Sequence, residues 1–143
     1  MQHSPRKFWE VWGRSDALHN RWAAAHGVNN YRLFVLYVLD NHPGATQKAI
    51  ADHAGLPKQT VNTVVRALRD EGYVTLSPAS DDRREKNASL TPAGQTYARA
   101  LLEPLYALED AVFARMGDVR VQEMMDAIAL FNMLFEKETE MIK

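Results

Sequence analysis

The fold of this chain is decided by the stretch Pro57-Lys-Gln-Thr-Val-Asn-Thr-Val-Val-Arg-Ala-Leu-Arg-Asp70, which Gly72 closes. On a helix, at about 100° per residue, its apolar side chains share one face. They are Val61, Val64, Val65 and Leu68. The other face carries amide, hydroxyl and charged groups, on Gln59, Asn62, Thr63, Arg66 and Asp70. Such groups can bond to nucleobase edges, although an ordinary amphipathic surface helix has the same pattern.

A second, shorter helical pattern precedes this stretch, over residues 46–54. Thr46 stands where a helix N-cap is expected. Gly55 stands in the turn between the helices, where a left-handed backbone is needed. Small Ala51 and apolar Val61 suit the contact between the two helices. A helix, a short glycine turn and a second helix with a polar face predict a helix-turn-helix.

Two segments with alternating polarity follow, and they predict a β-hairpin. They cover residues 73–77 and 86–91. Their apolar members are Val74 and Leu76, then Ala88 and Leu90. We expect the polar segment 78–85 to connect them, with Arg83 and Arg84 adjacent in it. A hairpin that carries arginines after the second helix is typical of a winged helix-turn-helix, in which arginine enters the minor groove.

These segments resemble the MarR family of winged helix-turn-helix regulators. The resemblance is carried by Leu56-Pro-Lys-Gln-Thr-Val61, Leu68-Arg-Asp-Glu-Gly-Tyr-Val74, Asp82-Arg-Arg84 and Leu90-Thr-Pro-Ala-Gly94. The last two are the most specific, and two prolines depart from the family pattern. Pro57 is harmless at a first helical position, whereas Pro104 should bend or divide its helix.

The resemblance implies a single domain over residues 1–143, mainly α with a small β-hairpin wing. Residues 30–91 would form the winged helix-turn-helix lobe, with the wing at about 73–91. Residues 5–27 and 92–143 would form dimerisation helices. A two-fold dimer would place two recognition helices about 34 Å apart, one turn of DNA, and would read an inverted repeat.

We expect the DNA contacts to come from three places. Side chains that face the major groove are Lys58, Gln59, Asn62, Thr63 and Arg66, with Thr60 nearer a phosphate. Gln47 and Lys48, at a helix N-terminus, suit phosphate. By the resemblance, Asp82 holds Arg84 in position through a charge-assisted bond, and Arg83 also reaches DNA.

The terminal segments predict apolar helices. The first, from Pro5 to about Gly27, is rich in aromatic residues, and the last runs from about Val121 to Glu138. Between them, residues 31–40 are apolar nearly all round, which predicts a buried helix, and Thr91-Pro92 predicts a helix start. Large apolar surfaces on a small chain indicate an interface. A packed interface competes with a second interpretation, in which Trp9, Trp12, Arg14, His19 and Tyr37 line a pocket for an aromatic or acidic effector.

Composition narrows the remaining choices. The chain has 143 residues, 46% of them hydrophobic, and no cysteine, which excludes disulfides and thiol-based sensing. No apolar run approaches the roughly 20 residues of a membrane span, and no signal peptide is evident, so we expect a cytoplasmic protein. The net charge is −1, so DNA affinity should rest on a few placed cations and on two-fold binding.

The sequence gives little reason to expect catalysis, a metal or a cofactor. The five histidines show no i, i+4 pair, the spacing of a helical metal site. No serine lies in a nucleophile-elbow motif, and the sequence contains no glycine-rich phosphate loop. The expected function is therefore a dimeric, sequence-specific DNA-binding regulator, more often a repressor, released by a small molecule. A winged-helix adaptor that binds another protein is the alternative, which the weak basic charge supports.

Overall fold

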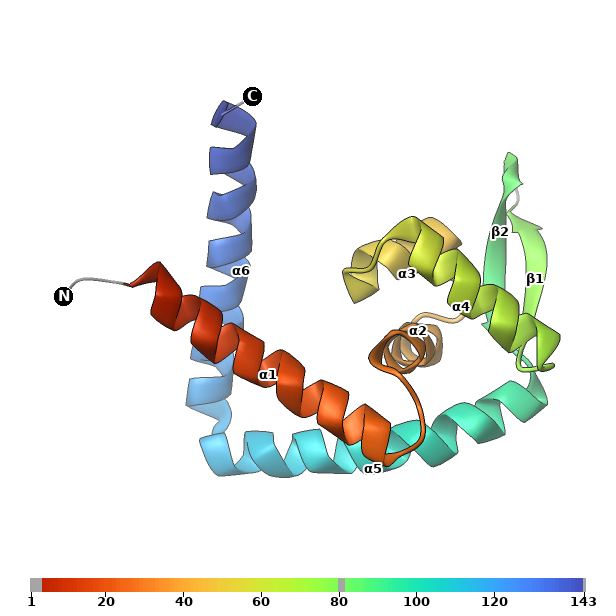
Figure 1. Ribbon diagram of the computed structural model, residues 1–143, viewed down its shortest axis with the longest axis horizontal. Coiled ribbons are helices and arrows are strands. Elements are labelled where there is room, and N and C mark those ends of the chain that lie inside the picture. The colour runs from red at the N-terminus through yellow and green to blue at the C-terminus, as the bar shows by residue number, and fades with distance from the viewer. Residues whose placement is uncertain (1–3, 80–81, 143) are drawn as a thin grey trace. The chain divides into compact units, whose positions relative to one another are not determined.

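The computed structural model describes residues 4–79 and 82–142, and for residues 79 and 82–84 the backbone alone (Figure 1). The described residues form six helices and a two-stranded antiparallel hairpin, which confirms a mainly α winged fold. In chain order these are α1 Pro5–Ala25, α2 Asn30–Asn41, α3 Gln47–Ala54, α4 Lys58–Asp70, β1 Val74–Ala79, β2 Asp82–Leu90, α5 Pro92–Met116 and α6 Asp118–Ile142. The chain divides into two compact units, Met1–Leu102 and Glu103–Lys143.

Helix α2 is the centre of the first unit. Its side chains Leu33, Val35 and Leu36 are fully buried, and the helix contacts both α3 and α4. Asn29 caps it, because its side-chain oxygen accepts a hydrogen bond of 2.8 Å from the backbone N–H of Arg32. The buried second helix that the sequence predicts is therefore confirmed.

The turn between α3 and α4 has the predicted geometry. Thr46 caps α3 by accepting a bond of 3.1 Å from the backbone N–H of Ala49, and Gly55 ends that helix with φ of 65°. Pro57 is the N-cap of α4 and not its first helical residue, so the prediction was one residue early. The inner face of α4 is fully buried at Val61, Val65 and Leu68, which fixes the direction of its polar face.

The predicted hairpin is confirmed, and its strands are longer than predicted. Val74 pairs with Leu90 and Leu76 with Ala88, which puts the alternating apolar residues on one face. The predicted connection over 78–85 was wrong, because residues 78–79 belong to β1 and residues 82–85 to β2. Polar side chains do not prevent this extension, since the bonds of a β-ladder come from the backbone.

The segment that precedes α3 also pairs with β2. The N–H of Gly44 donates to the carbonyl of Ala88 over 3.1 Å, and the N–H of Ala88 donates to the carbonyl of Ala45 over 2.9 Å. Thr46 and Asn87 form an isolated antiparallel bridge beside these bonds. The start of α3 is thereby held against the wing.

The Thr-x-x-Gly motif fixes the base of the wing against α5. The hydroxyl of Thr91 accepts a bond of 3.0 Å from the N–H of Gly94 and donates one of 2.7 Å to the carbonyl of Gly72. A Cβ on Gly94 would lie 1.9 Å from the carbonyl oxygen of Tyr73. Only glycine allows this approach, because real side chains do not come so close to a backbone atom.

Helices α5 and α6 complete the chain. Helix α5 continues through Pro104, so this proline does not divide it. Gly117, with φ of 85°, separates the two helices, and α6 is longer at both ends than the predicted span 121–138. Among the described residues, no helix is long and apolar enough to cross a membrane.

Candidate nucleic-acid interface

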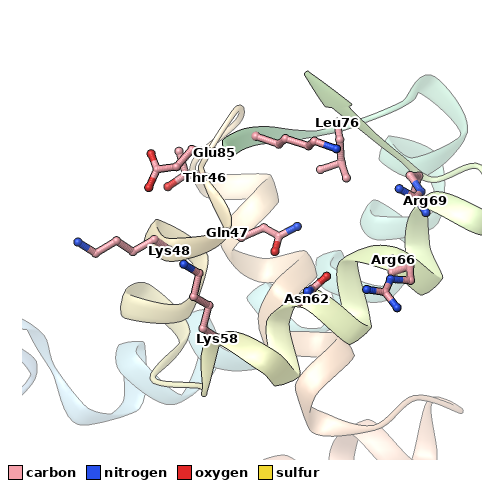
Figure 2. A pocket seen from close by; sticks show the side chains of 10 residues that line it. Thr46, Gln47, Lys48, Lys58, Asn62, Arg66, Arg69, Leu76 and Glu85 are labelled. Atoms are coloured by element: carbon pink, nitrogen blue, oxygen red, sulfur yellow. The ribbon is translucent and has the colours of Figure 1, made fainter. Parts of the chain in front are cut away.

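A groove with a volume of about 300 Å³ lies where α3, α4 and the wing meet, all within the first unit (Figure 2). Its lining residues are Thr46, Gln47, Lys48, Lys58, Asn62, Arg66, Arg69, Leu76, Glu85 and Lys86. Five of these side chains are basic and one is acidic, whereas the whole chain has a net charge of −1. Positive charge is therefore concentrated in this groove, where it would attract a polyanion.

One stripe of α4 forms a wall of the groove. Lys58, Asn62, Arg66 and Arg69 follow each other at intervals of four, four and three residues, so they lie above one another on the helix. The guanidinium of Arg69 is held loosely by Asp70, at 3.5 Å, and both side chains are largely exposed. These cations thus remain available for contacts outside the chain.

A second stripe of α4 faces further outward. Gln59 and Thr63 are exposed and Thr60 is half-buried, and none of the three lines the groove. The hydroxyl of Thr63 donates to the carbonyl of Gln59 over 3.0 Å. The methyl group of a threonine on this exposed face can contact the methyl group of thymine.

The N-terminus of α3 supplies the opposite wall. Gln47 and Lys48 are the first residues of that helix, where backbone N–H groups remain without a partner inside the helix. Figure 2 shows both side chains beside those of Lys58 and Asn62 from α4. The structure therefore brings together, around one groove, five of the residues that the sequence predicts for DNA binding: Gln47, Lys48, Lys58, Asn62 and Arg66.

The groove also contains residues that the sequence reasoning missed. Arg69 was missed although it follows Arg66 by three residues, a spacing that places both on one helical stripe. Lys86 was missed because strand alternation puts it on the same side as buried Ala88. Lys86 nevertheless lines the groove, as does Glu85, which precedes it on the strand.

The predicted wing residues Asp82, Arg83 and Arg84 lie in the backbone of β2. Their side chains are outside the described part of the structure, so their predicted roles stay predictions. They directly precede Glu85 and Lys86, which line the groove.

The predicted effector residues do not line the groove. Trp9 and Trp12 are exposed on α1, by 69% and 46%, and Arg14 is exposed beside them. The ring of His19 is bonded to the carbonyl of Ser15 over 2.8 Å, and Tyr37 is half-buried on α2. An effector pocket formed by these residues stays a prediction.

Two helices joined by a glycine turn, followed by a paired hairpin and bordering a cationic groove, define a winged helix-turn-helix protein. Residues 26–85 match the sequence model of the MarR family. The fold is similar to that of NMB1585, a MarR family regulator from Neisseria meningitidis, with a TM-score of 0.90, 28% identity, and coverage of 99% of this chain and 100% of that one. The chain therefore has the fold of a MarR family regulator, and its residues 26–85 are similar in sequence to that family.

Two relatives are similar in sequence over part of their length. YwhA of Bacillus subtilis, an uncharacterised HTH-type transcriptional regulator, is 30% identical over 89 residues, which are 62% of this chain and 64% of that protein. Rv2887 of Mycobacterium tuberculosis, an HTH-type transcriptional repressor, is 32% identical over 81 residues, 57% of this chain and 58% of that protein. The chain thus matches less than two thirds of the length of these relatives.

Proposed function

We propose that this protein is a dimeric transcription regulator that binds double-stranded DNA at a specific sequence. The observation that carries the proposal is the groove, whose lining includes five basic side chains, from α3, α4 and the wing, and one acidic side chain. In a chain with a net charge of −1, this concentration of cations suits the phosphate backbone of a duplex.

In this proposal α4 is the recognition helix and enters the major groove. Gln59, Asn62 and Arg66 provide amide and guanidinium groups that bond to adenine and guanine at two points each. Lys58 lies at the start of α4, and Thr60 lies nearer to a phosphate. The N-terminus of α3, with Gln47 and Lys48, binds a phosphate of the backbone.

The wing takes the minor groove. Arg83 and Arg84 provide the positive charge that a narrow minor groove attracts, and Asp82 holds Arg84 in position. These roles rest on the sequence pattern of the wing. Lys86 supports them, since it places a further cation where the wing borders the groove.

A two-fold dimer supplies the second half of the DNA site. Large apolar side chains are exposed on α1, at Phe8, Trp9 and Trp12, and on α6, at Ile128 and Phe135. Exposed apolar surface of this kind marks an interface. Two recognition helices related by a two-fold axis would read an inverted repeat whose halves are about 34 Å apart.

We further propose that the regulator is a repressor that a small aromatic or acidic molecule releases from DNA. The relative Rv2887 is named as a repressor, and the exposed aromatic residues of α1 suit a flat ligand. The effector would favour a conformation in which the two recognition helices no longer match the duplex. Such a regulator acts where the chromosome is, in the bacterial cytoplasm.

The test is selection of duplexes from a randomised pool by the purified protein, followed by affinity measurements over a range of salt. The selected sequences should contain an inverted repeat, and the logarithm of affinity should fall with the logarithm of salt by about 0.9 per neutralised phosphate. If no duplex is enriched and binding shows no salt dependence, DNA binding is excluded. The protein-binding adaptor would then become the favoured function.

A further inference from the structure

A second hollow, of about 420 Å³, lies in the first unit and shares no lining residue with the groove. It is lined by Gly27, Val28, Asn29, Arg32, Glu71, Tyr73 and Tyr97. Its charged and aromatic side chains come from four places: Arg32 from α2, Glu71 from the end of α4, Tyr73 from just before β1 and Tyr97 from α5. Both DNA-reading elements, α4 and the wing, therefore touch this hollow at their bases.

Direct contacts join these four side chains. The guanidinium of Arg32 donates one hydrogen bond to the carboxylate of Glu71 and a second, of 3.0 Å, from Nε to the hydroxyl of Tyr97. Its central carbon lies 5.3 Å from the centre of the Tyr97 ring. The rings of Tyr97 and Tyr73 are stacked, with centroids 4.3 Å apart and planes 2° apart. We call these four residues the Arg32 clamp.

The charge of Arg32 is secure in this position. Burial lowers its pKa, but the hydrogen bonds to Glu71 and Tyr97 outweigh that effect, so the pKa lies above the ordinary value. The side chain of Arg32 is 17% exposed and that of Glu71 is 48% exposed. The guanidinium thus donates to two partners at once, a geometry that lysine cannot reproduce.

Glu71 connects the clamp to the recognition helix. It is the C-cap of α4, and its N–H bonds to the carbonyl of Ala67. Tyr73 connects the clamp to the wing, because its N–H bonds to the carbonyl of Leu68 and its carbonyl accepts from the N–H of Thr91. The clamp therefore joins the last turn of α4 to both ends of the hairpin.

We propose that Arg32 is a positioning residue for DNA recognition, which sets the relation between α4 and the wing without contacting DNA. The proposal rests on the proposed DNA-binding function. The buried residues Val61, Val65 and Leu68 hold the body of α4, so this helix does not need Arg32 to fold. Arg32 instead fixes the end of the helix, and with it the distance between the cations of α4 and those of the wing.

Two adjacent acidic residues, Asp70 and Glu71, give a test in which the proposal predicts opposite changes of DNA affinity. Asp70→Ala and Glu71→Ala each remove one negative charge near the C-terminus of α4. By itself this removal stabilises the helix, whose C-terminus carries partial negative charge, and lowers the repulsion of DNA. Asp70 is outside the clamp, so Asp70→Ala should bind the selected duplex as tightly as the wild type or more tightly. Glu71→Ala should bind it about 2- to 30-fold more weakly, the usual range for a residue that acts through a coupled contact.

If both alanine variants bind DNA as tightly as the wild type or more tightly, the proposal is overturned, because the loss of a negative charge alone would then explain the affinities. Thermal unfolding of both variants gives the control for folding. A loss of DNA affinity in Glu71→Ala at an unchanged midpoint supports positioning, whereas a proportionate loss of stability contradicts it.

Hydrogen exchange tests the clamp without DNA. Arg32→Met should speed exchange in residues 69–76, while residues 61–68 keep the protection of the wild type. The matched control is Arg99→Met, which replaces an exposed arginine of α5 and should change neither segment. Faster exchange throughout the lobe would show that Arg32 supports the fold in general and does not position α4.

The conservative variant Arg32→Lys tests whether a positive charge at residue 32 restores part of the DNA affinity. Arg32→Lys keeps the charge and one bond to Glu71, so its DNA affinity should lie between those of the wild type and Arg32→Met. Equal losses in the lysine and methionine variants would contradict a clamp that depends on the ion pair. If the wild type selects no duplex, the DNA-binding function fails, and the exchange measurement still decides whether Arg32 fixes the end of α4.

Discussion

Helices α4 and α6 both carry apolar side chains along much of their length, yet these side chains are in opposite environments. In α4 the apolar residues Val61, Val65 and Leu68 are fully buried within one chain. In α6, residues 118–142, no residue is buried, and Phe135 is 63% exposed. Helix α4, whose outer face is polar, thus buries its apolar side chains within a single chain. The helix that faces outward with apolar groups has the composition of an interface.

The largest effect is expected from the inner face of α4. Leu68→Ala should lower the free energy of unfolding by about 2–5 kcal/mol, because it removes a buried side chain and leaves a cavity. Urea denaturation measures this loss. Association of the molecules that remain folded should not change, since Leu68 is fully buried. If folded Leu68→Ala molecules associate more weakly than the wild type, the inner face of α4 also contributes to association, and the contrast with α6 fails.

The next effect concerns the outer face of α6. The double change Ile128→Asp and Phe135→Asp should raise the dissociation constant of the proposed dimer by about 100-fold or more, because it would place unpaired charges in the proposed apolar interface. Sedimentation measures the change. Lys137→Asp is the matched control, since residue 137 lies on the opposite side of α6 from residues 128 and 135. An unchanged dimer in the double variant would locate the interface elsewhere.

Substitutions on the outer face of α4 should change DNA binding and leave both stability and association unchanged. Arg66→Ala should cost about 1–3 kcal/mol of DNA binding and relax the choice of base at one position of each half-site. Stability and association should stay as in the wild type, because Arg66 is exposed. Competition with duplexes changed at single positions measures this. Equal weakening on all sequences would assign Arg66 to a phosphate.

The wing should give differences in DNA affinity no larger than that of Arg66→Ala. Arg84→Ala should weaken DNA binding by about 1.5 kcal/mol, the value of one hydrogen bond to a charged group. Asp82→Ala should weaken it less, since Asp82 acts by holding Arg84. Affinity for the selected duplex measures both. A silent Arg84→Ala would remove the wing from DNA recognition and leave α4 as the reading element.

Local patterns in the sequence predicted the local features of this fold. Thr46 as a cap, Gly55 as a left-handed turn residue and the buried face of α4 each depend on a few neighbouring residues, so spacing alone reveals them. The end of β1 was not predictable in this way, because alternation stops near Ser77 while backbone pairing continues to Ala79. Groove residue Lys86 was hidden by the same alternation.

The Arg32 clamp shows where prediction from the sequence ends. Arg32 is 39 residues from Glu71 and 65 residues from Tyr97, and no periodic pattern connects such distant positions. Only the packing of α2 against its neighbours brings them together. The same applies to Gly94, whose motif is visible in the sequence although its reason, the approach to Tyr73, is visible only in three dimensions.

The pairing of β2 with the segment at Ala45 has a consequence for solubility. Near Ala88 this strand has hydrogen-bonded neighbours on both sides, so it offers no free backbone there to a strand from another molecule. On β1, Pro78 has no N–H with which to extend a ladder. The hairpin thus offers little free backbone as a template for edge-to-edge aggregation.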